Sequence, residues 1–223
     1  MALNIITAIN PEEDVYTKLL RKLLDFLHTL GSKEYDCGPK DSRDPLERVN
    51  ISELFTSRFI DRNEWGAIQP GGKVDGLQNL PKYVIISHSA SSKEAFTEEQ
   101  CAAEVRSYQT FHIYTKGWSD IGYNFLIGED GNVYEGRGWG KEGAHTKGLN
   151  KYSIGICFIG NFDRRLPNQK ALRAAKDLIR RGVKEGKIST NFILMGHRDF
   201  RDTVSPGKCL YQDLKTWPFY HGN

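Results

Sequence analysis

The sequence predicts an α/β domain with a central mixed β-sheet flanked by helices, preceded by an N-terminal helical extension. Two observations support this prediction. Short apolar runs, typical of buried strands, alternate with stretches that repeat apolar residues every three or four positions, as amphipathic helices do. The first 58 residues differ in character from the rest, so we expect residues 1–58 to form the extension and residues 59–223 the main domain.

The extension contains one strong helix signal. Asn10 can cap the helix, Pro11 fits its first turn, and Glu13 completes a capping box. The apolar stripe that follows consists of Tyr16, Leu19, Leu20, Leu23, Leu24, Leu27 and Leu30, and Gly31 ends it. Such a stripe should be covered, either by the chain's own domain or by a partner or second copy. Residues 31–50 are polar with Gly-Pro and Asp-Pro pairs, which predicts a linker.

The main domain begins near residue 59 and interleaves strands with helices. Strands are expected at residues 83–88, 123–127, 132–135, 153–159 and 192–197. Gly128-Glu129-Asp130-Gly131 separates two of them and indicates a hairpin. A capping box at residues 97–100 opens a helix with Cys101, Val105, Tyr108 and His112 on one side. A second helix is expected from Asn168 to Glu185, and a short one after Pro206 with Leu210 and Leu214 inward.

Composition argues against several classes of protein. The net charge is only +3 with both signs interspersed, which gives no electrostatic sign of nucleic-acid binding. No apolar run approaches the roughly 18 residues that a membrane-spanning helix needs. The first residues lack a basic stretch followed by a long apolar one, so we expect no secretory signal peptide.

The cysteines stand far apart, without a CxxC pair. They are Cys37, Cys101, Cys157 and Cys209. We interpret them as mostly free thiols, with Cys157 buried in a strand, which is typical of a reducing compartment. A cytoplasmic location is therefore the leading prediction, and secretion is the alternative. A disulfide between Cys101 and one other cysteine stays open at this point.

Two distant histidines are the first candidates for chemistry. His88 and His197 each end an apolar run, and strand ends are where side chains project into a site. Zinc binds imidazole readily, but a catalytic zinc site needs three protein ligands and one open position. Ser205 follows His197 by eight residues, and a neutral hydroxyl is a poor ligand. Cys209 is an alternative thiolate, although it falls one helical turn further on. We therefore predict no bound metal.

A second group of residues is typical of a binding site. Lysine, glycines, aromatics, arginine and histidine gather within thirty residues, at Lys116, Gly117, Trp118, Tyr123, Arg137, Trp139 and His145. Glycines let a ligand approach the backbone, and aromatic faces cover sugar or peptide stems. Arg137 stands between two glycines, with room to present its guanidinium to a carboxylate. A surface loop with a solvated arginine would show the same pattern, so the residues alone leave both interpretations open.

Seven segments in order carry a resemblance to a known family. They are residues 63–67 (NEWGA), 86–90 (ISHSA), 120–125 (DIGYNF), 133–139 (VYEGRGW), 143–145 (GAH), 154–156 (IGI) and 196–199 (GHRD). Over residues 59–219 the chain resembles the peptidoglycan recognition proteins, animal relatives of the zinc amidases that cut N-acetylmuramoyl-L-alanine bonds. The resemblance implies an α/β domain with a mixed sheet and a long ligand groove.

The resemblance also implies roles for particular residues. In amidase members the zinc ligands correspond to His88, His197 and a cysteine at position 205, with Tyr123 assisting. Ser205 stands in the cysteine's place, as in the family's non-catalytic receptors. Positions that match the family's ligand contacts are His88, His112, Lys116, Tyr123, His145 and Asn150. Gly117-Trp118 with Arg137 resembles the type that favours meso-diaminopimelic acid, whose extra carboxylate an arginine can clamp.

The sequence therefore predicts an innate immune receptor that binds diaminopimelic-type peptidoglycan fragments, without amidase activity and without a cofactor. His88, Tyr123, His197 and Ser205 would form its degenerate catalytic site. We expect signalling through an adaptor that contacts residues 1–58, or through self-association of loaded domains. The alternative is a zinc amidase with an altered ligand. A scaffold whose groove no longer binds is a third interpretation.

Overall fold

The computed structural model describes residues 57–222. The predicted N-terminal helix and the linker lie outside these described residues. The predicted domain boundary at residue 58 falls at the beginning of the described range. The extension therefore stays a prediction.

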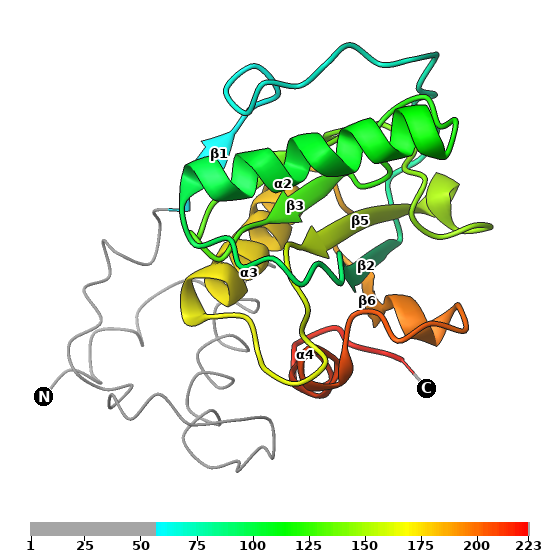
Figure 1. The fold of residues 1–223 in the computed structure, drawn as a ribbon. Coiled ribbons are helices and arrows are strands. Elements are labelled where there is room, and N and C mark those ends of the chain that lie inside the picture. The colour runs from blue at the N-terminus through cyan, green and yellow to red at the C-terminus, as the bar shows by residue number, and fades with distance from the viewer. Residues whose placement is uncertain (1–56, 223) are drawn as a thin grey trace, which may run out of the picture. The chain divides into compact units, whose positions relative to one another are not determined.

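A six-stranded mixed sheet forms the centre of the described region, as predicted (Figure 1). Its strands are β1 (Phe59–Ile60), β2 (Tyr83–His88), β3 (Phe125–Ile127), β4 (Val133–Glu135), β5 (Ser153–Phe158) and β6 (Ile193–Gly196). Their order across the sheet is β1-β4-β3-β5-β2-β6. Only the β3–β4 hairpin is antiparallel, and the other neighbours run parallel. The short strand β1 was not among the predicted strands.

Helix α2 (Glu98–Thr110) covers one face of this sheet (Figure 1). The predicted capping box is present: the Thr97 side chain accepts from the Gln100 backbone, and the Gln100 side chain accepts in return. Cys101 and Val105 of the helix pack in one buried cluster with Leu126, Tyr134 and Cys157 of the strands. The predicted inner side of this helix is therefore confirmed, and it continues into a π-helical turn, Phe111–Thr115, that carries buried His112.

Helix α3 (Gln169–Lys184) lies on the opposite face. Asn168 caps it by accepting from the Ala171 N–H, as predicted. Phe125 precedes Leu126 and so points the other way from the α2 face. Its ring packs 4.3 Å from the Trp139 ring, which in turn leaves no room for a side chain at Gly182 of α3. Helices thus cover both faces of the sheet, in agreement with the predicted fold class.

The last helix, α4 (Lys208–Leu214), follows β6 and buries Leu210 and Leu214, as expected. Cys209, near its beginning, is disulfide-bonded, so the prediction of a free thiol is wrong at this residue. Cys101 and Cys157 are free, which also excludes the suggested Cys101 disulfide. Disulfides are typical of oxidising compartments, so the predicted cytoplasmic location loses the support it drew from free thiols.

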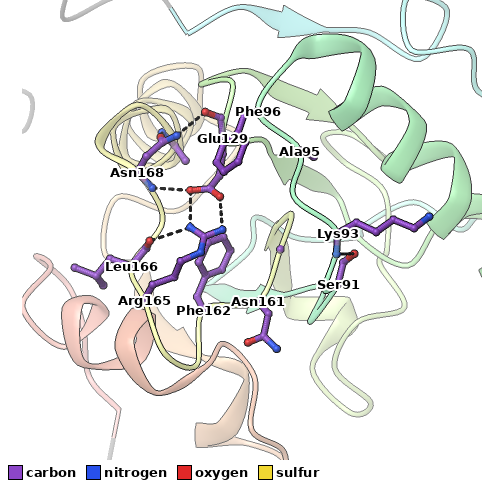
Figure 2. Close-up of polar contacts among 12 residues, drawn as sticks. Ser91, Lys93, Ala95, Phe96, Glu129, Asn161, Phe162, Arg165, Leu166 and Asn168 are labelled. Atoms are coloured by element: carbon purple, nitrogen blue, oxygen red, sulfur yellow. Dashed lines mark hydrogen bonds and ion pairs between the residues drawn. The ribbon is translucent and has the colours of Figure 1, made fainter. Parts of the chain in front are cut away.

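An ion pair between partly exposed Arg165 and buried Glu129 joins the β3–β4 turn to the segment before α3, as Figure 2 shows. Both Glu129 carboxylate oxygens accept from the Arg165 guanidinium, at 2.9 and 2.5 Å. The same carboxylate accepts from the Asn168 backbone, and the Asn168 side chain donates to the Glu129 carbonyl. This pair therefore fixes the beginning of α3 against the sheet.

Among residues 57–222, none of the helices combines the length and apolar character that a membrane crossing needs.

Replacing Arg165 with Met should destabilise the domain, because it leaves the Glu129 carboxylate, 3% exposed, without its cation. We expect a loss of about 2 kcal/mol in the free energy of unfolding, below the 3–5 kcal/mol of fully buried pairs because Arg165 itself is partly solvated. Urea denaturation measures it. Arg181→Met, which breaks the exposed pair with Glu185, is the matched control and should cost under about 0.5 kcal/mol. Equal losses in both variants would contradict the buried-pair argument.

Candidate functional site

The predicted histidine pair is brought together by parallel strand pairing. His88 is the last residue of β2, and His197 directly follows β6, which pairs with β2 in parallel. Both residues therefore lie at the same edge of the sheet. Ser205 joins them from the following loop: its hydroxyl accepts from the His88 N–H at 3.1 Å, and its carbonyl accepts from the Arg198 N–H at 3.0 Å. The three positions singled out in the sequence thus form one group.

The hydrogen bonds of His88 do not suit a metal ligand. Its Nδ1 accepts from the Phe162 N–H at 3.2 Å, which places the imidazole proton on Nε2. A metal-binding histidine instead donates its second N–H to an acceptor. Nε2 is buried without a protein partner, so in this tautomer it offers an unused donor. Burial lowers the pKa of His88 to about 4, which keeps the ring neutral near pH 7.

The remaining donor set also does not fit zinc. Ser205 supplies a hydroxyl, and no group of three histidine, cysteine or acidic residues within residues 57–222 is arranged to hold a metal ion. Cys209, considered above as a substitute thiolate, is disulfide-bonded and cannot serve.

His145 lies over the sheet beside this group. Its ring covers Gly155 of β5, where an added Cβ would come within 2.3 Å of the imidazole Cδ2. Only glycine allows this close approach. The Asn150 side chain accepts from the backbone of His145 at 3.1 Å and of Thr146 at 2.8 Å, so it holds the loop in place. Burial lowers the pKa of His145 to about 3, and its Nε2 is a second buried atom without a protein partner.

Tyr123 and His112 continue the group toward the end of α2. The two rings meet edge to face at 5.7 Å, and His112 stacks on the half-exposed Trp118 at 4.7 Å. The His112 Nδ1 accepts from the Gly122 N–H at 3.1 Å, which leaves Nε2–H as its donor. Burial raises the pKa of Tyr123, whose hydroxyl lies near the Cys157 thiol. Tyr123 is therefore a neutral hydroxyl at neutral pH.

Lys116 and Gly117 form the turn between His112 and Trp118. The Lys116 ammonium lies 5.3 Å from the centre of the Phe111 ring, and the lysine side chain is exposed. Gly117 has a φ of +68°, a backbone conformation that residues other than glycine rarely adopt. Nothing lies within 4 Å of the position that an added Cβ would take. Glycine is thus required here by the backbone conformation, with open space around it.

Arg137 is held more tightly than its two flanking glycines suggested. Its Nε donates to the Ile121 carbonyl at 2.7 Å, and its terminal nitrogens donate to the carbonyls of Glu142 at 2.8 Å and Asp120 at 3.3 Å. Of the five guanidinium N–H groups, one remains on each terminal nitrogen. The expected room for the side chain is therefore partly filled by backbone, and two of its N–H groups make no hydrogen bond within the described residues.

Two buried polar residues in this region were not among the predicted site residues. Asn124 donates to the carbonyls of Gly138 and Lys141 and accepts from the Gly155 N–H, so it ties the Arg137 loop to β5. Asp120, 2% exposed, accepts from Arg62 and Gln109. Both stand in the DIGYNF segment, but a local pattern does not reveal partners so far away in the sequence.

The mixed sheet and the two histidines at the ends of adjacent parallel strands agree with the fold that the resemblance implied. The family model described as N-acetylmuramoyl-L-alanine amidase matches residues 77–208. The chain belongs to this family and, within it, to the peptidoglycan recognition proteins that the resemblance indicated.

Two curated relatives illustrate the similarity. The chain is 45% identical to peptidoglycan-recognition protein LE of Drosophila melanogaster over 74% of this chain and 48% of that protein. It is 44% identical to peptidoglycan recognition protein 1 of Rattus norvegicus over 72% of this chain and 87% of that protein. The matched region therefore spans about half of the Drosophila relative and most of the rat one.

Solved structures show the same fold. Wild-type Drosophila PGRP-LB superimposes with a TM-score of 0.73 at 41% identity, covering 75% of this chain and 98% of that one. Peptidoglycan recognition protein-LE in complex with tracheal cytotoxin, a monomeric diaminopimelic acid-type peptidoglycan, gives 0.72 at 44% identity, with 74% and 96% covered. A tracheal cytotoxin complex of the PGRP-LCa and PGRP-LCx ectodomains gives 0.72 at 45% identity, with 74% and 98% covered.

The buried histidines should make stability depend on pH. Burial lowers the pKa of His112 to about 4, below the 6.5 of an ordinary histidine, so the unfolded chain takes up a proton first as pH falls. The free energy of unfolding should be highest above pH 6.5 and fall toward pH 4, by up to about 1.4 kcal/mol per pH unit for each such histidine. Urea denaturation at several pH values measures this. The fall should be shallower in His112→Gln, and an unchanged slope would refute the assignment.

Proposed function

We propose that this protein is a peptidoglycan receptor that binds diaminopimelic-type muropeptides without hydrolysing them. The observation that carries the proposal is the guanidinium of Arg137, fixed by three carbonyls with two N–H donors left over. A carboxylate accepts two parallel N–H bonds from such a group. The extra carboxylate of meso-diaminopimelic acid distinguishes it chemically from lysine, so a fixed arginine suits the diaminopimelic type.

The rest of the site supports a peptide stem and sugar as ligand. The exposed face of Trp118 stacked on His112 offers a flat apolar surface. His88 and His112 are buried and His145 is partly buried, and all three are neutral at pH 7, while His88 and His145 each keep a buried Nε2 without a protein partner. Such atoms gain most from a bound amide or hydroxyl, since leaving them unpaired costs free energy. The relatives PGRP-LE and PGRP-LCa/LCx, whose complexes contain tracheal cytotoxin, support the same ligand class.

The absence of hydrolysis is the finer part of the proposal. It is supported by Ser205 in place of an anionic ligand and by the Phe162 N–H directed at His88 Nδ1. For Nε2 to bind zinc, the ring proton would have to move to Nδ1, where it would face another donor. The competing function is a zinc amidase with an altered ligand, and its support is the amidase family match and the retained pair His88 and His197.

The signalling step also belongs to the proposal. We propose that loaded domains associate, or that an adaptor contacts residues 1–58, as predicted from the leucine-rich stripe. The complex of the PGRP-LCa and PGRP-LCx ectodomains with tracheal cytotoxin is the precedent for association. A cytoplasmic location remains part of the proposal, and the disulfide of Cys209 counts against it.

Replacing Arg137 with Ala should remove the preference for diaminopimelic over lysine muropeptide. One lost charge-assisted pair corresponds to about 1.5–3 kcal/mol, or roughly a 10- to 100-fold loss for the diaminopimelic ligand. Affinity for the lysine ligand should change little. Isothermal titration calorimetry of both ligands measures the effect, with Arg181→Ala on the surface of α3 as the control. Unchanged discrimination between the two ligands would end this assignment.

Zinc content and amide release separate the receptor from the amidase. The wild-type protein should hold less than stoichiometric zinc and release no peptide from muropeptide, because its third position is a hydroxyl. Ser205→Cys restores a thiolate and should bind zinc more tightly than the wild type. Metal analysis and chromatography of the digest measure both. Stoichiometric zinc together with turnover in the wild type would instead establish the amidase.

A further inference from the structure

Arg62 connects two segments of the chain that meet at Arg137. One segment contains Asp120 and Ile121, whose carbonyls accept from the Arg137 guanidinium, and the other is the backbone that leads from Gly136 into Arg137. Arg62 donates through Nη1 to the Gly136 carbonyl at 2.6 Å and pairs through Nη2 with the Asp120 carboxylate at 3.0 Å. A single guanidinium therefore contacts both the residue before Arg137 and the residue whose carbonyl orients it.

Asp120 is the centre of this arrangement. Its carboxylate accepts from the Ile121 N–H and from the Gln109 side chain, each at 2.8 Å, in addition to Arg62. Ile121 is the residue whose carbonyl receives the Arg137 Nε at 2.7 Å. The buried carboxylate thus orients the peptide units that present their carbonyls to Arg137. Gln109 in turn exchanges two hydrogen bonds with the backbone of Ile68, which anchors the network to α2.

The charges in this network are also coupled. Arg62 and Arg137 carry like charges on either side of Asp120, and the carboxylate compensates both. Burial lowers the pKa of Arg137, and the charges of Asp120 and Glu142 oppose that effect. A lysine in place of Arg62 could neutralise Asp120 but could not also reach the Gly136 carbonyl, because the ammonium is a compact group without the guanidinium's planar fork.

We infer that Arg62 and Asp120 are positioning residues for Arg137 and thereby determine selectivity among muropeptides, although neither needs to touch the ligand. This inference rests on the proposed function. A preoriented pair of donors binds a carboxylate without a further loss of side-chain conformational freedom. A fixed arginine therefore has a lower entropic cost of binding than a mobile one. Weakening the contacts between Arg62 and Asp120 should therefore lower affinity for the diaminopimelic ligand specifically.

A double-mutant cycle tests the inference. Arg62→Lys keeps the charge beside Asp120 and should fold, and we expect it to reduce the diaminopimelic-to-lysine affinity ratio about tenfold. In an Arg137→Ala background the same change should leave the ratio as it is, because the group that Arg62 positions is gone. Calorimetry with the two muropeptides measures all four proteins. Asp120→Asn, which keeps the shape but removes the charge pair, should behave like Arg62→Lys.

Arg165→Lys is the matched control, because it alters another ion pair with a buried carboxylate, that of Glu129, which does not include Arg137 (Figure 2). It should lower stability without changing the affinity ratio. Equal losses of affinity for both muropeptides in Arg62→Lys, or an effect that adds to that of Arg137→Ala, would show a purely structural role and overturn the inference.

A measurement without ligand separates this inference from the proposed function. The Arg137 Nε–H, bonded to the Ile121 carbonyl, should give a slowly exchanging signal in ¹H–¹⁵N spectra, assigned by its loss in Arg137→Ala. The hydrogen exchange of this N–H should become at least tenfold faster in Arg62→Lys, because the contacts of residue 62 with Gly136 and Asp120 are weakened. An unchanged signal would refute the positioning. A slow signal in a wild-type protein that shows no diaminopimelic preference would refute the proposed function while leaving the positioning intact.

Discussion

The parallel pairing of β2 with β5 on one side and β6 on the other is the constraint on which the site depends. It places the end of β2, with His88, beside the end of β6, where His197 follows. It also places Gly155 of β5 where His145 can cover the bare backbone. Since parallel strands end at the same edge of a sheet, residues more than a hundred positions apart become neighbours there without any local sequence signal.

Within that frame, the imidazoles of His88, His112 and His145 are each held by a backbone N–H or by a neighbouring side chain and are kept neutral by burial. His88 accepts from Phe162, and His112 accepts from Gly122. A buried neutral ring with a fixed tautomer is a directional hydrogen-bonding group, which suits recognition of amides and hydroxyls. The same arrangement opposes metal binding at His88, so recognition and hydrolysis place different demands on one residue. Ser205, bonded to the His88 backbone, is consistent with recognition.

The charged part of the site, the Arg137 guanidinium, is also preorganised. A solvated arginine would lose conformational freedom on binding a carboxylate, whereas Arg137 has already lost it to three carbonyls. The cost of burying Asp120 is offset by Arg62, Gln109 and the Ile121 N–H. The folded structure thus holds Arg137 in one geometry. The residues that hold it, Arg62, Asp120 and Gln109, are not the ones that would contact the ligand.

Local patterns determined much of this protein. The apolar runs predicted β2, β5 and β6, the capping residues Thr97 and Asn168 predicted where two helices begin, and the motif segments indicated the family. They succeeded because strand and helix signals depend on residues a few positions apart. Tertiary structure alone decided that Cys209 is disulfide-bonded, that Arg137 is held by carbonyls, and that Arg62 reaches Gly136, 74 residues away. These contacts depend on which distant donors and acceptors folding brings together, and no local period encodes them.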